Sequence, residues 1–217
     1  MLKKLSGEKL GEILETGIAE FAAHGLDRAN INVIAKKSGV SVGVLYKYFE
    51  NKEGFFLSCL RYSLEVLRSV IEDAMSGGGT LLARAEKLVR AVQRCAREHG
   101  TYNVMYNEIT AGASQKYAQV LAQQIESITS EVYTRFIAEA RAAGDIRGDI
   151  DPKLFAFFFD NLLLALQFSY SCDYYRERFK IFCGEDILDD DEKVASELLK
   201  FLQSAFALGQ TEISQEG

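Results

Sequence analysis

The sequence contains little of what would indicate a sheet protein. One proline occurs in 217 residues, and alternating runs of Val, Thr and Ile are scarce. Ala, Leu, Glu, Lys and Arg recur in long stretches instead, and these residues favour helices. The composition therefore predicts an all-α fold, in a chain long enough for one large domain or two small ones that each bury a core.

A metal site and a disulfide framework are also not indicated. The four cysteines, Cys59, Cys95, Cys172 and Cys183, are too far apart for a zinc spacing such as CxxC. Three fall in predicted helices, where free cysteine usually acts as a small buried hydrophobe. The charged first ten residues are followed by no signal-peptide pattern. We expect no metal, no cofactor and a reducing, cytoplasmic setting.

The sequence has no long, uninterrupted hydrophobic run. Its most apolar stretch, residues 154–170, contains Asp160, Asn161 and Gln167. A membrane-spanning helix needs about 20 predominantly apolar residues. A helix that is apolar all round is otherwise explained by burial on both sides. The stretch therefore predicts a buried helix and no membrane span.

Catalytic motifs are missing as well. The sequence contains no GxSxG, HExxH, P-loop or dinucleotide-binding fingerprint. The three aspartates at 189–191 are explained as a helix cap and as negative charge at a helix N-terminus. We therefore do not expect an enzyme.

The net charge of −6 argues against a nucleic-acid footprint over the whole surface, since such a footprint is normally basic. The charge is unevenly distributed. Residues 1–60 hold eight of the 25 Lys and Arg residues and seven of the 31 Asp and Glu residues. The acidity therefore belongs to the larger C-terminal part, and the N-terminal part remains compatible with binding to phosphates.

Apolar periodicity, capping residues and glycines predict about nine helices and no internal repeat. The glycine-rich segment 76–79 is the clearest break. Two short helices are expected within residues 30–50, and the others at 7–24, 52–75, 81–99, 102–111, 114–143, 152–175 and 191–209.

The segment 30–56 is the most informative part of the chain. Asn30 and Ser41 can each cap a short helix, and Gly39 supplies a left-handed residue between the two. In the second helix Val44, Leu45 and Phe49 are expected to point inward. Two crossed helices of this size commonly present one helix to the DNA major groove.

These residues resemble the N-terminal DNA-binding domain of the tetracycline-repressor (TetR) family. The matching positions are Phe21, Gly25, Ile34, Ala35, Gly39, Val40, Ser41, Gly43, Leu45, Tyr46, Phe49, Lys52 and Glu53. Four positions depart from the family pattern: Ala29 and Asn30 replace the usual Thr-Thr, Tyr48 stands where histidine is common, and Phe56 where leucine is.

The resemblance implies a three-helix helix-turn-helix domain at residues 1–50. A larger helical ligand-binding and dimerisation domain would follow at 51–217, with helix 52–75 as the connection. It also implies a homodimer that binds a palindromic operator. The residues expected to contact DNA are Asn30, Ser41, Val42, Gly43, Tyr46, Lys47, Tyr48 and Lys52.

Helices 152–175 and 191–209 are the candidate dimer contacts, because consecutive phenylalanines in the first suggest burial against a twin subunit as well as the core. A single unusually thick core is the alternative. An apolar or aromatic effector is expected to bind among the helices between 81 and 175. Candidate residues, each of which could equally be ordinary core, are Tyr102, Met105, Tyr106, Tyr117, Phe158, Asn161 and Gln167.

Together these features predict a ligand-responsive transcriptional regulator, most simply a repressor that a small molecule releases from its operator. The second interpretation is a helical protein that binds a small molecule or a lipid and has no DNA activity. The acidic C-terminal part is its support.

Overall fold

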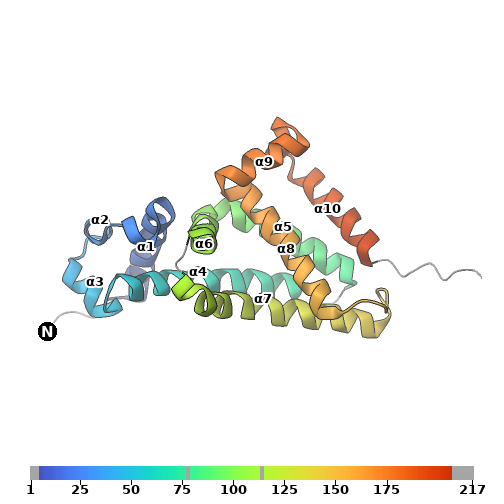
Figure 1. Ribbon diagram of the computed structural model, residues 1–217, viewed down its shortest axis with the longest axis horizontal. Coiled ribbons are helices and arrows are strands. Elements are labelled where there is room, and N and C mark those ends of the chain that lie inside the picture. The colour runs from blue at the N-terminus through green and yellow to red at the C-terminus, as the bar shows by residue number, and fades with distance from the viewer. Residues whose placement is uncertain (1–4, 77–78, 113–114, 207–217) are drawn as a thin grey trace, which may run out of the picture.

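The computed structural model describes residues 5–76, 79–112 and 115–206, which form ten α-helices, one 3-10 helix and no strand (Figure 1). The predicted all-α fold is therefore confirmed. The elements are α1 (Gly7–Arg28), α2 (Ile31–Lys37), α3 (Val42–Phe49), α4 (Lys52–Met75), α5 (Leu81–Glu98), α6 (Gly100–Gly112), α7 (Gln115–Ala143), α8 (Pro152–Ser171), α9 (Asp173–Cys183), η1 (Glu185–Asp189) and α10 (Asp191–Phe206).

The helix caps expected in the N-terminal part are present. The Asn30 side chain accepts a hydrogen bond from the Asn32 amide at 2.9 Å, and the Ser41 hydroxyl accepts one from the Val44 amide at 3.2 Å. Gly39 has φ of 63°, the left-handed conformation that ends α2. At Gly25 (φ 69°) α1 is kinked and then continues for one turn, so it ends later than predicted.

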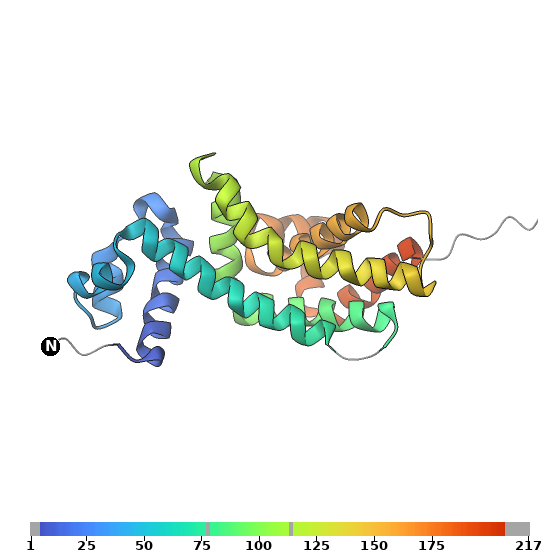
Figure 2. The same ribbon diagram turned by 90° about the horizontal axis from the view of Figure 1, so that it is seen from below.

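Helices α1–α3 and the first half of α4 form a small unit, here called the head. Its core includes Phe21 of α1, Ile34 of α2, Leu45 of α3 and Phe55 of α4. In α4 the apolar residues recur at helical spacing, so the helix seals the head with its first turns and reaches the rest of the chain with its last ones. Figures 1 and 2 both show α4 running from the head along the length of the molecule.

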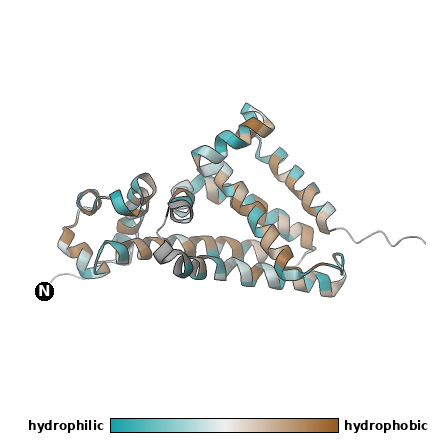
Figure 3. Cartoon of the chain, viewed as in Figure 1, coloured by the Kyte–Doolittle hydropathy of each residue, from teal (hydrophilic) through white to brown (hydrophobic). Residues whose placement is uncertain are grey.

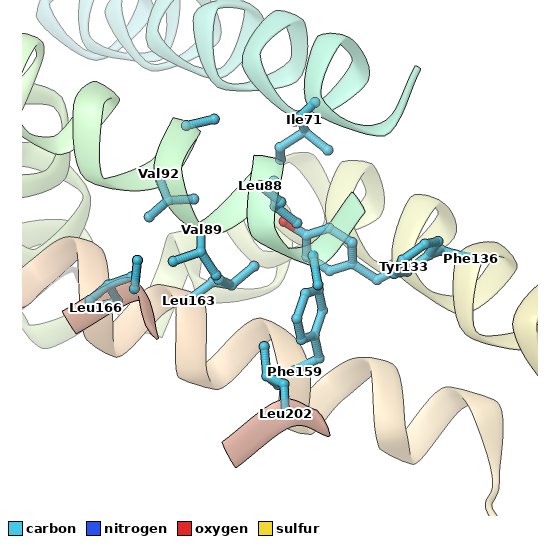
Figure 4. Close-up of a cluster of buried hydrophobic side chains, with 14 of the residues drawn as sticks. Ile71, Leu88, Val89, Val92, Tyr133, Phe136, Phe159, Leu163, Leu166 and Leu202 are labelled. Atoms are coloured by element: carbon cyan, nitrogen blue, oxygen red, sulfur yellow. The ribbon is translucent and has the colours of Figure 1, made fainter. Parts of the chain in front are cut away.

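The remaining helices form the body, which has a second hydrophobic core. Helix α8 packs against α5 and α7 in its middle, and α4 covers α5. Figure 4 shows Tyr133 of α7 and Phe159 of α8 meeting edge to face, with ring centroids 5.3 Å apart. Aromatic pairs in this geometry are worth about 0.5–1.5 kcal/mol beyond the area they bury.

The helix predicted at 152–175 is two helices, which is why ten helices replace the predicted nine. Cys172 has extended backbone angles (φ −108°, ψ 129°) and separates α8 from α9. The Asp173 carboxylate in the first turn of α9 favours a helix start at this point. The last predicted helix, 191–209, ends in the structure at Phe206, and residues 207–209 lie outside the described ranges.

Arginines of α5 hold the start of α10. Arg97 donates two hydrogen bonds to the Asp191 carboxylate, at 2.6 and 3.0 Å, and Arg90 forms a bidentate pair with Glu192. Such fork-shaped pairs fix orientation as well as distance. The acidic residues near 190 thus attach α10 to the body.

Helix α8 is long and apolar enough to cross a membrane by length and composition alone. A core helix passes the same test. In the structure α8 contacts α5, α6, α7 and α9, and Asp160 and Gln167 point from it into the body. These contacts bury one side of α8, whereas Leu154, Phe157 and Phe158 are exposed on it, so burial on both sides stays a prediction.

Candidate nucleic-acid interface and ligand cavity

Helix α3 has one face in the head core and one face outside it. Leu45 is 1% exposed, and the Phe49 ring lies 4.6 Å from that of Phe55. On the other side Tyr46 is 41% exposed, and Lys47 and Gly43 are exposed as well. Val44, which was expected to point inward, is half-buried. The head therefore presents a short helix with an aromatic and cationic surface.

The other residues predicted to contact DNA have contacts within the chain. Tyr48 accepts a hydrogen bond at its hydroxyl from the Leu5 amide at 2.7 Å. Lys52 donates from Nζ to the Asp27 carbonyl at 2.8 Å. Val42 is half-buried against the head core. These contacts connect α3 and the start of α4 to the rest of the head, and the role of each side chain in DNA binding stays a prediction.

A buried glutamate positions the helix pair. Glu20 of α1 is 5% exposed, and its carboxylate accepts a hydrogen bond from the Asn30 amide at 3.1 Å. Lys37 Nζ lies 3.7 Å and His24 Nε2 lies 3.8 Å from the same carboxylate. The sequence reasoning missed this residue. The sequence did contain a signal for its burial, because Glu20 lies two turns after Ile13 on the same apolar face of α1.

Helices α4 to α8 enclose a cavity of about 30 Å³ in the body. Such a volume holds water but lies well below the roughly 300–1,000 Å³ of ligand pockets. Two predicted effector residues, Tyr106 and Gln167, line it. The full lining is Leu67, Ile71, Val92, Tyr106, Glu126, Thr129, Tyr133, Asp160, Leu163, Leu164 and Gln167.

Four other predicted effector residues lie elsewhere. Tyr102 and Met105 belong to the head core. Phe158 is 58% exposed, and Asn161 is exposed and donates to the Phe157 carbonyl at 2.7 Å. The reason is helical phase, since Phe158 and Asn161 do not share the face of α8 that turns toward the cavity. The side chain of Tyr117 lies outside the described residues.

Two carboxyl groups face the cavity, and the sequence reasoning assigned neither to a site. Glu126 of α7 accepts a hydrogen bond from the Tyr106 hydroxyl at 2.8 Å. Burial raises the pKa of Asp160 to about 6, the charge of Glu126 adds to the increase, and a hydrogen bond from Thr129 opposes it. For Asp160 the sequence offered a signal, since it is a charged residue inside the most apolar stretch of the chain.

Helix α6 connects this cavity to the head. One turn before Tyr106, the Tyr102 hydroxyl donates to the Glu15 carboxylate of α1. The His99 ring stacks on Tyr102 with centroids 4.8 Å apart. The two tyrosines of α6 are therefore hydrogen-bonded to different parts of the molecule, Tyr102 to the head and Tyr106 to the body. Figure 1 shows α6 standing between the head and the body.

Several large apolar side chains of the body are exposed. They belong to α8, α9 and α10, along which Figure 3 shows hydrophobic residues as brown segments. The exposed set comprises Leu154, Phe157, Phe158, Tyr174, Ile181, Phe182 and Phe201. Exposed apolar patches of this kind mark interaction surfaces. No group of three metal-binding side chains occurs among the residues the structure describes.

Comparison with known proteins supports the same interpretation of the head. Residues 13–59 match the family described as "Bacterial regulatory proteins, tetR family". The HTH-type transcriptional repressor KstR2 of Mycobacterium tuberculosis is 30% identical over 148 residues, which cover 66% of this chain and 72% of that protein. The chain belongs to the TetR family. The resemblance inferred from residues 21–53 is therefore confirmed.

A second TetR-family relative, the probable acrEF/envCD operon repressor of Escherichia coli, is 30% identical over 117 residues. The match covers 50% of this chain and spans about half of that relative, 53% of its length. Its similarity is therefore partial.

The solved structure of another transcriptional regulator has the same fold. FadR of Bacillus subtilis, determined in complex with stearoyl-CoA, superposes with a TM-score of 0.67 at 17% identity. The superposition covers 88% of this chain and 97% of FadR. At this identity the likeness establishes the architecture, and the chemistry of the cavity has to be argued from its own residues.

Proposed function

We propose that this TetR-family protein is a transcriptional repressor that binds operator DNA through α3 and is released by a small-molecule effector. The observation that carries the proposal is the outward face of α3. Its tyrosine and lysine, Tyr46 and Lys47, are exposed, and Gly43 leaves room for close approach to a groove. Lysine can donate to guanine O6 and N7, and tyrosine can donate to phosphate.

We infer that the repressor acts as a homodimer. One short helix reads few base pairs, so a palindromic site with half-sites about 34–36 Å apart, or a multiple of that, doubles the specificity. The exposed phenylalanines of α8 and α10 are the surface we assign to the twin subunit. Helix α9 also carries exposed apolar residues, Tyr174, Ile181 and Phe182, and we include them in the same candidate surface.

The effector would act by shifting a population of conformers. In the described conformation the cavity is too small for a ligand, so binding has to widen it and favour a conformer in which α6 has moved. The Tyr102–Glu15 contact then transmits the movement to α1. Coupling between two sites of this kind is typically about 1–3 kcal/mol, or 5–150-fold in operator affinity.

A mobility-shift titration with the DNA upstream of the protein's own gene tests the DNA-binding part. The double variant Tyr46→Ala with Lys47→Ala should lose tight, salt-sensitive binding, and the slope of log affinity against log salt should decrease. Lys87→Ala, an exposed lysine on α5, is the matched control and should bind as the parent does.

Retention of tight binding by the double variant would refute the assignment of α3. A parent protein that binds no DNA, and yet binds small molecules, would support the other interpretation, a helical ligand-binding protein without DNA activity.

A further inference from the structure

The cavity in the body has charged groups of one sign. Glu126 on α7 and Asp160 on α8 both line it, and no lysine, arginine or histidine is among the described residues that do. All ion pairs found among the described residues involve other carboxylates. Two like charges in a mostly apolar enclosure are unfavourable unless a proton or a cation compensates them.

The other polar groups of the cavity include a hydrogen-bond acceptor, the amide carbonyl of Gln167. Gln167 is 9% exposed, lines the cavity, and its amide has no hydrogen-bond partner within the ranges that the structure describes. Its carbonyl oxygen is an acceptor for an N–H group. The rings of Tyr106 and Tyr133 form part of the wall and offer π faces to a positive charge.

We propose that the effector is a lipophilic cation, with a protonated amine placed between Glu126 and Asp160 and an apolar body among the leucines of α4 and α8. The proposal rests on the proposed function, because it names the ligand class of the same cavity. An ammonium group would offset the negative charge of the two carboxylates and donate a hydrogen bond to Gln167. A carboxylate or phosphate ligand would meet repulsion at the same place.

A cation also gives a reason for α6 to move. In the described conformation the Tyr106 hydroxyl is the hydrogen-bond donor to Glu126. An ammonium group is a charged donor and forms the stronger bond to a carboxylate. When it replaces the tyrosine, the hydrogen bond between α6 and α7 is lost, and the cavity can widen.

Three probes that share one skeleton test the charge preference: phenylbutylamine, phenylbutanol and phenylbutyrate, titrated calorimetrically into the full-length protein at neutral pH. The amine should bind at least about tenfold more tightly than the alcohol, a ratio equal to about 1.4 kcal/mol. The butyrate should bind more weakly than the alcohol.

Variants locate the effect in the cavity. In the double variant Glu126→Gln with Asp160→Asn, the affinity for the amine should fall to the affinity for the alcohol. Both replacements keep the shape and polarity of the side chain but remove its charge. Glu131→Gln, an exposed glutamate on the same helix, is the matched control and should leave the preference unchanged. Thermal unfolding of each variant verifies that it is folded, and the three probes on the parent protein decide the question independently of the variants.

The inference is overturned if the amine is not preferred, including the case in which no probe binds, or if the preference survives in the double variant. A mobility-shift experiment with the same three probes distinguishes failure of the cation proposal from failure of the proposed repressor function. Operator release by the alcohol or the butyrate would leave the repressor intact and refute the cation. Tight amine binding without any DNA binding would refute the repressor and keep the cation site.

Discussion

Replacing Asp160 by asparagine should stabilise the protein, and the gain should depend on pH. Burial and the nearby Glu126 raise the pKa of Asp160 from its ordinary 3.8 to about 6 in the folded chain. The folded state therefore keeps a proton that the unfolded state releases between about pH 4 and pH 6. Stability attributable to this residue falls as pH rises through that window and is lowest above it.

The magnitude follows from the shift. At 1.36 kcal/mol for each pKa unit, ionised Asp160 costs the folded state up to about 3 kcal/mol. Solvent reaches part of the side chain, so we expect Asp160→Asn to gain about 1–3 kcal/mol at pH ~8 and close to nothing at pH ~4. Glu126→Gln should give part of the same gain, and the double variant should gain less than the sum, because the two carboxylates interact.

Urea unfolding followed by circular dichroism, at one protein concentration and one ionic strength, measures these differences. Asp145→Asn, at an exposed aspartate before α8, is the control and should change stability little at either pH. An equal gain for Asp160→Asn at both pH values would refute the reasoning. So would a loss at alkaline pH, because either result means that the carboxylate is not penalised in the cavity.

Other changes test the head, the connection and the dimer surface. Gly17→Ala should destabilise the head by about 1–3 kcal/mol in urea unfolding, since an added Cβ would lie 2.5 Å from the Phe55 ring. Glu20→Gln should weaken operator binding in mobility shifts, because it removes the charge near Lys37 that orients α2. Tyr102→Phe should leave calorimetric ligand binding unchanged and reduce operator release, and unaltered release would exclude this contact from the switch. Phe158→Ser should shift the mass measured by light scattering from dimer toward monomer.

Local patterns were sufficient for the head and for most helix boundaries. Asn30, Gly39 and Ser41 act on their own neighbours within a few residues, so their capping and turn roles could be predicted without the fold. The division of residues 152–175 was missed for the opposite reason. No proline or glycine lies near Cys172 to mark the break, and its side chain is buried where the backbone becomes extended.

The lining of the candidate effector cavity could be assigned only from the tertiary structure. Periodicity identifies which residues point inward but not which core they enter, and therefore Tyr102 and Met105 were assigned to a pocket although they belong to the head. Tyr106, one turn later, does line the cavity. One face of α6 packs into the head core at Tyr102 and Met105 and lines the cavity of the body at Tyr106. The apolar spacing in the sequence is the same along the whole face and does not distinguish the two.

The sequence by itself determined the all-α class, the TetR-family head and the outward face of α3, because these follow from local propensity, capping and fixed motif spacing. Only the tertiary structure shows that Glu126 and Asp160 line the same cavity, because they lie on different helices and 34 residues apart in the chain. Their mutual effect is a matter of distance and of shared burial. Neither quantity can be obtained from sequence order.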